Sequence, residues 1–288
     1  MTSRLAPALA LALLLAAGVA DAQTAPARIR PEVASGAMNE YNYSLSDDGR
    51  TAVFARSEAD FRRAKIMVAE RRNGAWTAPE PIAFSDDRWR DSDPWLTPDG
   101  RTLLFVSDRP TPSRPDRHDL DIWRSVKRDG VWQTPEHLGH VVNGVGEELG
   151  PELHDGRLYF ATARKSGMGG LDVYAAEVTA DGFAKPALLP APINSAASES
   201  DFTLSRDGRT ALFWRMVDGQ GRIHMSRRTG DAWSEPVPLN AAVNAGRFNF
   251  TPALSRDGKR LTFASDRPRE GQPEGMADLY QVVFADAL

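Results

Sequence analysis

Short apolar segments of strand length alternate with polar turn residues along almost the whole chain. The clearest turn signal is Asp-Gly, which recurs with its glycine at Gly49, Gly100, Gly156, Gly208 and Gly258. Successive glycines are 51, 56, 52 and 50 residues apart. A period of this length is typical of repeat architectures, in which each repeat is one supersecondary unit.

One repeat has the pattern of a four-stranded antiparallel sheet. A strand ends at a leucine, Asp-Gly makes a tight turn, and an apolar strand then ends in phenylalanine, as in the segment from Leu45 to Phe54. A third strand follows a variable loop. A second turn then leads to an aromatic residue, at Trp76, Trp132, Phe183 and Trp233, with a proline three residues later. Because proline is confined to sheet edges and strand ends, we expect the fourth strand at the outer edge and the aromatic residues packed within the blades.

A single sheet of this kind cannot bury both of its faces, but several sheets packed radially can. The sequence therefore predicts an all-β fold, a five-bladed β-propeller of four-stranded antiparallel blades. We expect residues 23–288 to form this single domain. The blades would lie at about 38–84, 89–140, 146–191, 197–241 and 247–288.

The fifth repeat stops after its third strand, and its missing strand has a candidate near the N-terminus. Pro26 and Ile29 repeat the spacing between proline and the next aliphatic residue that marks the other fourth strands. We therefore expect residues 24–33 to complete the last blade, so that closure leaves no open sheet edge. The alternative is an N-terminal arm beside an open last blade.

The first residues have the pattern of a secretory signal peptide. Arg4 precedes an apolar run from Leu5 to Ala20, and Ala20-Asp21-Ala22 is a small-x-small cleavage pattern. The run is short for a spanning helix, which needs about 20 apolar residues. We expect residues 1–22 to be removed near Ala22, leaving a periplasmic or secreted protein with no membrane span. The alternative is an uncleaved anchor.

Composition narrows the classes of function. The chain has 35 basic and 39 acidic side chains and a net charge of -4, unlike the basic surface of a nucleic-acid-binding protein. It has no cysteine, which excludes disulfides, Cys-ligated zinc and thiol catalysis. No feature indicates an oligomer, so we expect a monomer.

At this point the repeat resembles the WD-like β-propeller repeat of bacterial envelope proteins, the TolB-type propeller. The matching elements are Leu-Ser-x-Asp-Gly-Arg-Thr, the strand ending in phenylalanine, and Ser-Asp-Arg at 107–109 and 265–267. The resemblance covers nearly all of the mature chain. It implies a propeller that binds partners, but such propellers differ widely in what they bind. Some family members carry a peptidase domain, and the Gly-x-Ser-x-Gly motif of that domain is missing here.

Antiparallel connectivity places the Asp-Gly turns on one face, the turn face, and the longer loops on the other, the variable face. Variable loops on a rigid scaffold are the usual place for binding. Equivalent positions at the start of the innermost strands carry Glu40, Asp91, Glu148, Glu199 and Asn249. Two residues further on stand Asn42, Asp93, Gly150, Asp201 and Thr251.

This pattern predicts a ring of carboxylates around a channel mouth on the variable face. Such a ring could hold a basic peptide group or a calcium ion, since calcium needs several oxygen ligands. The alternative is structural: each carboxylate caps backbone amides or pairs with a nearby arginine. We expect no other cofactor.

A second recurring set consists of arginines that follow the strand phenylalanine. Where a third-strand aspartate is also present, we expect ion pairs within the blade, because a planar guanidinium suits a carboxylate. The expected pairs are Arg109–Asp121, Arg164–Asp172 and Arg267–Asp278. This leaves Arg56, Arg215 and Arg222 without such a partner, and they are candidates for contacting an anionic ligand.

The leading interpretation is a binding or scaffolding module for a protein or cell-envelope glycan, without catalysis. The alternative is a glycosidase, because some five-bladed propellers hydrolyse sugars with carboxylates near the central cavity. Hydrolysis needs two carboxylates about 5 Å apart for retention or about 6.5–9.5 Å apart for inversion. Candidates are Asp91, Asp93, Glu148, Glu199 and Asp201. Trp89 and Trp95 stand beside two of these acids, as tryptophans do in many sugar sites.

Overall fold

The computed structural model describes residues 24–29, 36–111, 113–271 and 273–288. The predicted signal peptide lies outside these residues. Within them, no helix is long and apolar enough to cross a bilayer. The regular structure is almost entirely β, with two short 3-10 turns, η1 (Ala59–Phe61) and η2 (Phe284–Ala287).

The five periodic Asp-Gly pairs turn the chain between the two inner strands of each sheet. In the first repeat, Asp48 accepts hydrogen bonds from the Ser46 hydroxyl (2.6 Å) and the Arg50 amide (2.9 Å). Gly49 then has a φ of +66°, a conformation that costs glycine little and other residues more. The side chain of aspartate and the freedom of glycine together explain why this dipeptide recurs.

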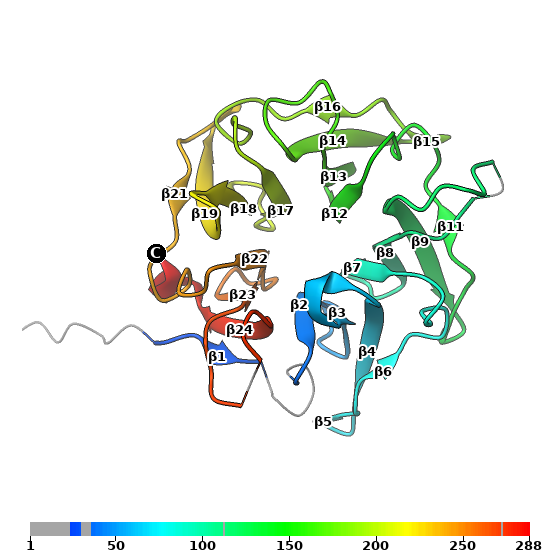
Figure 1. Ribbon diagram of the computed structural model, residues 1–288, viewed down its shortest axis with the longest axis horizontal. Helices are drawn as coiled ribbons and strands as arrows, with labels where there is room; N and C mark the ends of the chain where they lie inside the picture. Colours follow the sequence, from blue (N-terminus) through cyan, green and yellow to red (C-terminus); the bar gives the residue numbers. More distant parts are fainter. Residues whose placement is uncertain (1–23, 30–35, 112, 272) are drawn as a thin grey trace, which may run out of the picture.

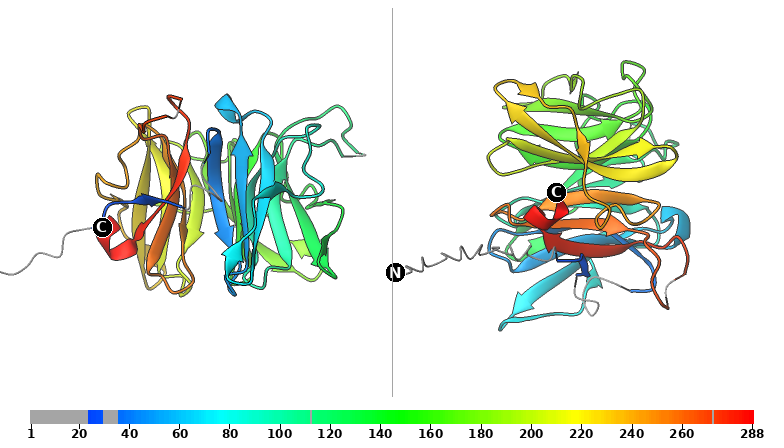
Figure 2. Two further views of the ribbon diagram at one scale, coloured as in Figure 1. Left: turned by 90° about the horizontal axis from the view of Figure 1, so that it is seen from below. Right: turned by 90° about the vertical axis from the view of Figure 1, so that its left-hand side faces the viewer.

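Five such sheets surround a central axis, as Figure 1 shows, and their strands run along that axis (Figure 2). The innermost strands are β2 (Asn39–Leu45), β7 (Asp91–Leu96), β12 (Glu148–His154), β17 (Glu199–Leu204) and β22 (Asn249–Leu254). The second strands are β3 (Thr51–Ser57), β8 (Thr102–Ser107), β13 (Arg157–Thr162), β18 (Thr210–Val217) and β23 (Arg260–Ser265). The third strands are β4 (Lys65–Arg72), β9 (Asp121–Arg128), β14 (Asp172–Thr179), β19 (Gln220–Thr229) and β24 (Asp278–Val283). The predicted five-bladed propeller is confirmed.

The outer strand of blades 1 to 4 is divided into two short pieces, which both pair with the third strand. The pieces are β5 (Ala75–Trp76) and β6 (Glu80–Pro81), β10 (Val131–Trp132) and β11 (Glu136–His137), β15 (Gly182–Phe183) and β16 (Ala187–Leu188), and β20 (Ala232–Trp233) and β21 (Val237–Pro238). The recurring proline ends each gap between the pieces, where a residue without an N–H cannot continue the ladder. The aromatic residue of each first piece packs against the hydrophobic core, as predicted.

The last blade takes its outer strand from the N-terminal part of the chain. Strand β1 (Ala27–Arg28) pairs antiparallel with β24, with Ala27 opposite Gln281. The Ile29 amide continues the ladder by donating to the Leu279 carbonyl at 2.9 Å. Figure 1 shows β1 beside β24 on the outside of the ring. The predicted closure by an N-terminal strand is confirmed, and residues 30–33 of the expected segment lie outside the described residues.

The core lies within and between the blades. The phenylalanine that ends each second-strand motif is at most 1% exposed in all five repeats: Phe54, Phe105, Phe160, Phe213 and Phe263. Burying a side chain of this size contributes about 1.5–3 kcal/mol. Five equivalent anchors therefore hold the blades in register and fix the strands that line the axis.

Candidate functional site: an axial cavity

The four acids and one amide at the start of the innermost strands are fully buried. This set, here called the acid ring, has an exposed fraction of 0% in every member: Glu40, Asp91, Glu148, Glu199 and Asn249. The repeat places all five at the variable-face end of their strands, as expected. Their burial means that none of them faces solvent for a ligand to contact directly.

Each acid of the ring is bonded to an arginine from the second strand of its own blade or the residues just after it. The contacts are Arg56 Nε to Glu40 at 2.9 Å, Arg109 Nη2 to Asp91 at 2.6 Å, Arg164 Nη2 to Glu148 at 3.2 Å, and Arg215 Nε to Glu199 at 2.7 Å. The guanidinium groups also lie over the buried phenylalanines, 5.3–5.5 Å from the ring centroids. The acid ring is therefore neutralised inside the protein.

The same ring holds the loop that enters each blade. Backbone amides donate to the second oxygen of three acids and to the amide oxygen of Asn249: Gly36 to Glu40 at 3.0 Å, Gly144 to Glu148 at 3.1 Å, Ser195 to Glu199 at 3.1 Å, and Gly246 to Asn249 at 3.1 Å. Burial still raises the pKa of Glu40, Asp91 and Glu148, although arginines and N–H donors oppose it. These contacts match the structural alternative to a ligand site, in which each carboxylate caps backbone amides or pairs with a nearby arginine.

The expected pairs between these arginines and third-strand aspartates do not form. Arg109 and Arg164 bind the acid ring instead of Asp121 and Asp172. Asp121 is bonded to His137 at 2.9 Å. Asp172 accepts backbone N–H groups from residues 168 and 169 at 2.9 and 3.1 Å.

Arg267 and Asp278 also have other partners. Arg267 donates to the carbonyl of Val243 at 2.8 Å, and its blade carries Asn249 in place of an acid. Asp278 is bonded to Arg269. The physical reason is register: the end of the second strand faces the start of the first, as Glu148 faces Thr162.

Arg56 and Arg215, which lack a third-strand aspartate and were candidates for contacting an anionic ligand, bind the acid ring instead. Arg222, the third candidate for an anionic ligand, donates to the carbonyl of Gly246 at 2.7 Å and to Gln220. All three arginines therefore have protein partners.

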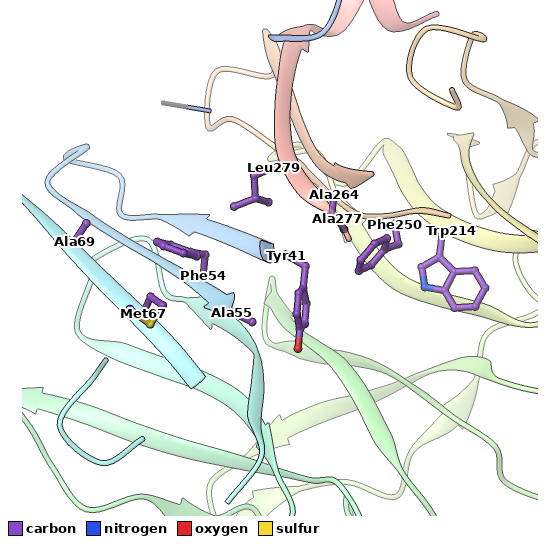
Figure 3. Close-up of a cluster of buried hydrophobic side chains, with 10 residues drawn as sticks. All are labelled: Tyr41, Phe54, Ala55, Met67, Ala69, Trp214, Phe250, Ala264, Ala277 and Leu279. Carbon is purple, nitrogen blue, oxygen red and sulfur yellow. The ribbon is translucent and has the colours of Figure 1, made fainter. Parts of the chain in front are cut away.

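An aromatic cluster lies just inside the variable-face end of the innermost strands. Tyr41 and Phe250 belong to strands β2 and β22, with ring centroids 6.0 Å apart, and Phe61 packs edge-on against both. Phe248 extends the cluster from Phe250 to Trp214, at centroid distances of 4.7 and 5.4 Å. Figure 3 shows Tyr41, Phe250 and Trp214 side by side. Large side chains thus fill the region where the sequence predicts a channel mouth.

The opposite end of the axis contains a cavity of about 820 Å³. Its lining runs from Asn42 and its equivalents to the Asp-Gly turns, so the axial cavity opens on the turn face. Its walls include Trp95, Leu153 and Leu204, and its rim includes Arg206 and Arg256. A volume of this size is typical of ligand pockets.

The base of the axial cavity is formed by a ring of β-bulges. Each innermost strand contains one extra residue at the same position, with φ between +48° and +56°: Asn42, Asp93, Gly150, Asp201 and Thr251. This set is here called the bulge ring. A bulge re-aims side chains, and these all line the cavity.

Side chains of the bulge ring accept N–H groups from the next blade. Asp93 accepts from the Gly150 amide at 2.9 Å, Asp201 from the Thr251 amide at 3.1 Å, and Thr251 Oγ1 from the Asn42 amide at 3.2 Å. Gly150 lies between the two aspartates, and a Cβ there would come within 3.0 Å of Asp201 Oδ1. The glycine thus leaves room for two carboxyl groups at the base of the cavity.

Sequence reasoning missed Glu152. It stands two residues beyond Gly150, where the other blades carry Ser44, Trp95, Thr203 and Ala253, and it lines the axial cavity. One of its oxygens accepts the Leu204 amide at 3.1 Å. The signal that could have found it is a single acid at a position without acids in the other repeats.

Three carboxyl groups that line the axial cavity have raised pKa values. Burial, followed by the charge of Asp93, raises the pKa of Asp201 to about 8. Burial raises the pKa of Glu152 to about 7 and also raises that of Asp93. Glu40, Asp91 and Glu148 also have raised pKa values, but Asp93, Glu152 and Asp201 line a cavity, where perturbed acids are candidates for a functional site.

Among the described residues, no group of three or more His, Cys, Asp or Glu side chains is placed to hold a metal ion. Calcium binding at the channel stays a prediction. A calcium-dependent rise in melting temperature would support it, because a ligand that binds only the folded state stabilises that state.

No protein-family model matches the chain, and no curated protein sequence matches it. Solved structures match its fold. A putative TolB from Agrobacterium tumefaciens has a TM-score of 0.54 and 13% identity, over 87% of this chain and 79% of that one. The catalytic domain of the GH62 α-L-arabinofuranosidase of Coprinopsis cinerea has a TM-score of 0.58 and 11% identity, over 90% and 96%.

A thermostable family-43 glycoside hydrolase is also similar, with a TM-score of 0.57 and 10% identity, over 88% of this chain and 91% of that one. Identities this low establish a shared fold and leave function open. The likeness to TolB-type propellers is confirmed at the level of fold. No family model supports the finer assignment to the WD-like repeat family.

Proposed function

We propose that this protein is an exported, TolB-like binding module that takes a protein or cell-envelope ligand into the axial cavity from the turn face. The observation that carries the proposal is the cavity itself, about 820 Å³ with mixed apolar and polar walls. The proposal places the binding site on the turn face, whereas the sequence predicted it on the variable face. The acid ring on the variable face is buried and bonded to arginine.

Export to the periplasm or beyond belongs to the same proposal. The apolar run before Ala22 and its small-x-small exit support it. We expect no nucleic-acid partner, since the net charge is -4. N-terminal sequencing of the protein from the envelope fraction checks the cleavage, with Gln23 expected as the first residue.

Affinity capture from an envelope extract tests the binding function. The mature chain from Gln23 is compared with Ala253→Trp, which fills the cavity from its wall, and with the control Ala180→Trp on an exposed turn. The proposal predicts a protein or glycan retained by the parent and the control but lost by Ala253→Trp. Equal retention by all three folded proteins would contradict binding in the cavity.

A glycosidase is the second candidate, because burial raises the pKa of Glu152 to about 7 and that of Asp201 to about 8. A general acid requires a carboxyl group that holds its proton near neutral pH. Hydrolysis also needs an ionised partner. The pKa of Asp93 is raised as well, and its Oδ2 is engaged by the Gly150 amide. The available acids therefore support binding better than turnover.

Hydrolysis of aryl glycosides, arabinofuranosides and xylosides included, tests this second candidate. Turnover by the parent that is lost in Asp201→Asn would establish the enzyme and contradict a purely binding role. The binding proposal predicts no turnover by either protein.

A further inference from the structure

The acids of the acid ring and those of the axial cavity differ in whether they form ion pairs with the protein's own cations. Four acids of the acid ring each have an arginine within 3.2 Å. Within the described part of the chain, no lysine or arginine forms an ion pair with Asp93, Glu152 or Asp201. Asp93 is buried, and Glu152 and Asp201 are half-buried. A carboxylate withdrawn from solvent normally needs a cationic partner. A cation that enters the cavity can therefore still form an ion pair with Asp93, Glu152 or Asp201.

The surroundings of these acids supply hydrogen bonds but little positive charge. Neutral groups dominate around Glu152, namely the Leu204 amide and the side chains of Thr203 and Trp95. The strongest charge acting on Asp201 is that of Asp93, which is repulsive. Arg90 lowers the pKa of Asp93, but it forms no ion pair with it.

A further acceptor faces the same space. Asn42 belongs to the bulge ring and lines the cavity, and its Oδ1 is buried without a hydrogen-bond partner in the described residues. Leaving a buried acceptor unsatisfied costs about 1–3 kcal/mol. A donor that enters the cavity can bond to this oxygen as well as to the carboxyl groups.

The path from the rim to these acceptors is largely apolar. Leu45, Leu96, Leu153, Leu204 and Leu254 occupy equivalent positions above the bulge ring and line the cavity. An occupant that reaches the base therefore needs a slender apolar stem and a cationic tip. A lysine side chain has this form, because its methylene stem packs on apolar surface while its ammonium supplies three donors.

We propose that the axial cavity recognises a lysine side chain of a partner protein, whose ammonium group enters the part of the cavity that Asp93, Glu152 and Asp201 line. This inference rests on the proposed binding function and specifies the chemistry of the ligand. The rim fits a protein surface of mixed charge, since it carries Asp47, Asp257, Arg206 and Arg256. Arg256 is already bonded to Asp47 across two blades.

The test uses two small probes of equal stem, Nα-acetyl-lysine N-methylamide and Nα-acetyl-norleucine N-methylamide. Binding to the mature chain is followed at about pH 9 by NMR, on the amide signal of Gly150 and the indole signal of Trp95. At this pH Glu152 and Asp201, whose pKa values are raised to about 7 and about 8, are largely ionised, while the ammonium group of the probe is still charged. A saturable shift with the lysine probe, at least about tenfold tighter than with the norleucine probe, is expected.

Charge-neutral variants identify the groups that recognise the probe. Glu152→Gln and Asp201→Asn keep an oxygen for the Leu204 and Thr251 amides, so both should fold. Each should weaken the lysine probe by about tenfold or more and leave the norleucine probe unchanged. The matched control is Glu80→Gln, which removes one exposed acid on the outer edge of blade 1 and should have no effect.

Three results would overturn the inference. These are equal binding of both probes, binding of the lysine probe that survives both cavity variants, and no binding at millimolar concentrations. A free alkylamine that binds while the lysine probe does not would assign the cavity to a small amine instead. Failure here alone leaves the proposed function standing, if capture of a partner still depends on Ala253.

Discussion

At the scale of single residues, Gly150 is the one position of the bulge ring without a side chain, and this leaves space at the base of the axial cavity. The equivalent residues Asn42, Asp93, Asp201 and Thr251 all carry side chains at positive φ. A side chain at position 150 would crowd the neighbouring blade, because its Cβ would lie 3.0 Å from Asp201 Oδ1 and 3.2 Å from Asp201 Cα. Backbone atoms give way less readily than the end of a flexible side chain. Glycine at position 150 therefore leaves room for Asp201 of the neighbouring blade, in addition to adopting the positive φ of the bulge.

Gly150→Ala should destabilise the protein more than Gly49→Ala. Both glycines have positive φ, which costs alanine about 1–2 kcal/mol, but a Cβ at Gly49 meets nothing within 4 Å. The contact with Asp201 should add about 1–3 kcal/mol, typical of overpacking. Chemical denaturation of both variants measures the difference. Equal losses of stability would show that the bulge ring relaxes around a methyl group.

The aspartate of the same contact should make stability depend on pH. Asp201 ionises near 3.8 in the unfolded chain and near 8 in the folded protein, where burial favours the neutral acid. The folded state then holds more protons between these values. Stability should therefore fall as pH rises from about 4 to about 8 and change no further from this source above that.

Asp201→Asn removes this titration and keeps an oxygen for the Thr251 amide. Its stability relative to the parent should increase steadily across the same window, as measured by urea denaturation at several pH values. Glu152 titrates in both proteins and cancels in the comparison. A difference that stays constant with pH would show that the carboxyl group of Asp201 is ionised throughout.

At the scale of elements, the acid ring fastens the variable-face loops to the innermost strands. Glu199 illustrates the arrangement, since it accepts the Ser195 amide and is bonded to Arg215, which also donates to the carbonyls of Pro192 and Ile193. One ion pair thus fixes the loop that precedes β17. This structural role explains why the pair of an acid and an arginine recurs in four blades.

Arg215→Met should cost about 3–5 kcal/mol of stability, because it leaves Glu199 buried without its cation. Arg157→Met is the matched control, since its pair with Glu177 joins side chains that are 50% and 65% exposed. Exposed pairs contribute about 0–1 kcal/mol. Comparable losses in the two variants would mean that burial does not strengthen the ring pairs.

The sequence was sufficient to predict the repeat, the four-stranded blades and the positions of the ring acids, because one periodic pattern carries all three. It did not predict which arginine meets which acid. Residue spacing places Arg164 near both Glu148 and Asp172, and only the observed register decides between them. The divided outer strand was also unexpected, although the proline that interrupts it is visible in every complete repeat.

At the scale of the whole molecule, the ring is closed by pairing residues from opposite ends of the chain. Strand β1 covers the edge of β24, which would otherwise present unpaired backbone groups. The chain has no cysteine, so a designed disulfide can report this contact without interference.

Ala27→Cys with Gln281→Cys should form a disulfide and stabilise the protein by about 2–4 kcal/mol, because the two residues are direct partners and the closed loop is long. A fragment pattern on non-reducing gels after proteolysis detects the bond. Arg28→Cys with Gln281→Cys is the control, since adjacent residues of a strand point to opposite faces. Equal cross-linking of both pairs would contradict the observed register.

The open end of the axis could not be predicted from the sequence. The repeat places acids at the variable-face end in most blades, which favours a channel mouth there. The aromatic cluster that fills this end comes from non-repeating residues, such as Phe61, Trp214 and Phe248. Their convergence depends on the closed ring, since blades 1, 4 and 5 contribute to one cluster. The axial cavity and Glu152 follow from the same three-dimensional arrangement.

Site-specific photo-cross-linking in cells is the most direct test of the central claim that a ligand enters from the turn face. A photoreactive residue is placed at Ala253, in the wall of the axial cavity, or at Ala245, on an exposed variable-face loop. The account predicts a discrete adduct with one envelope protein from position 253 and none from position 245. An adduct from position 245 alone would contradict it and return the binding site to the variable face.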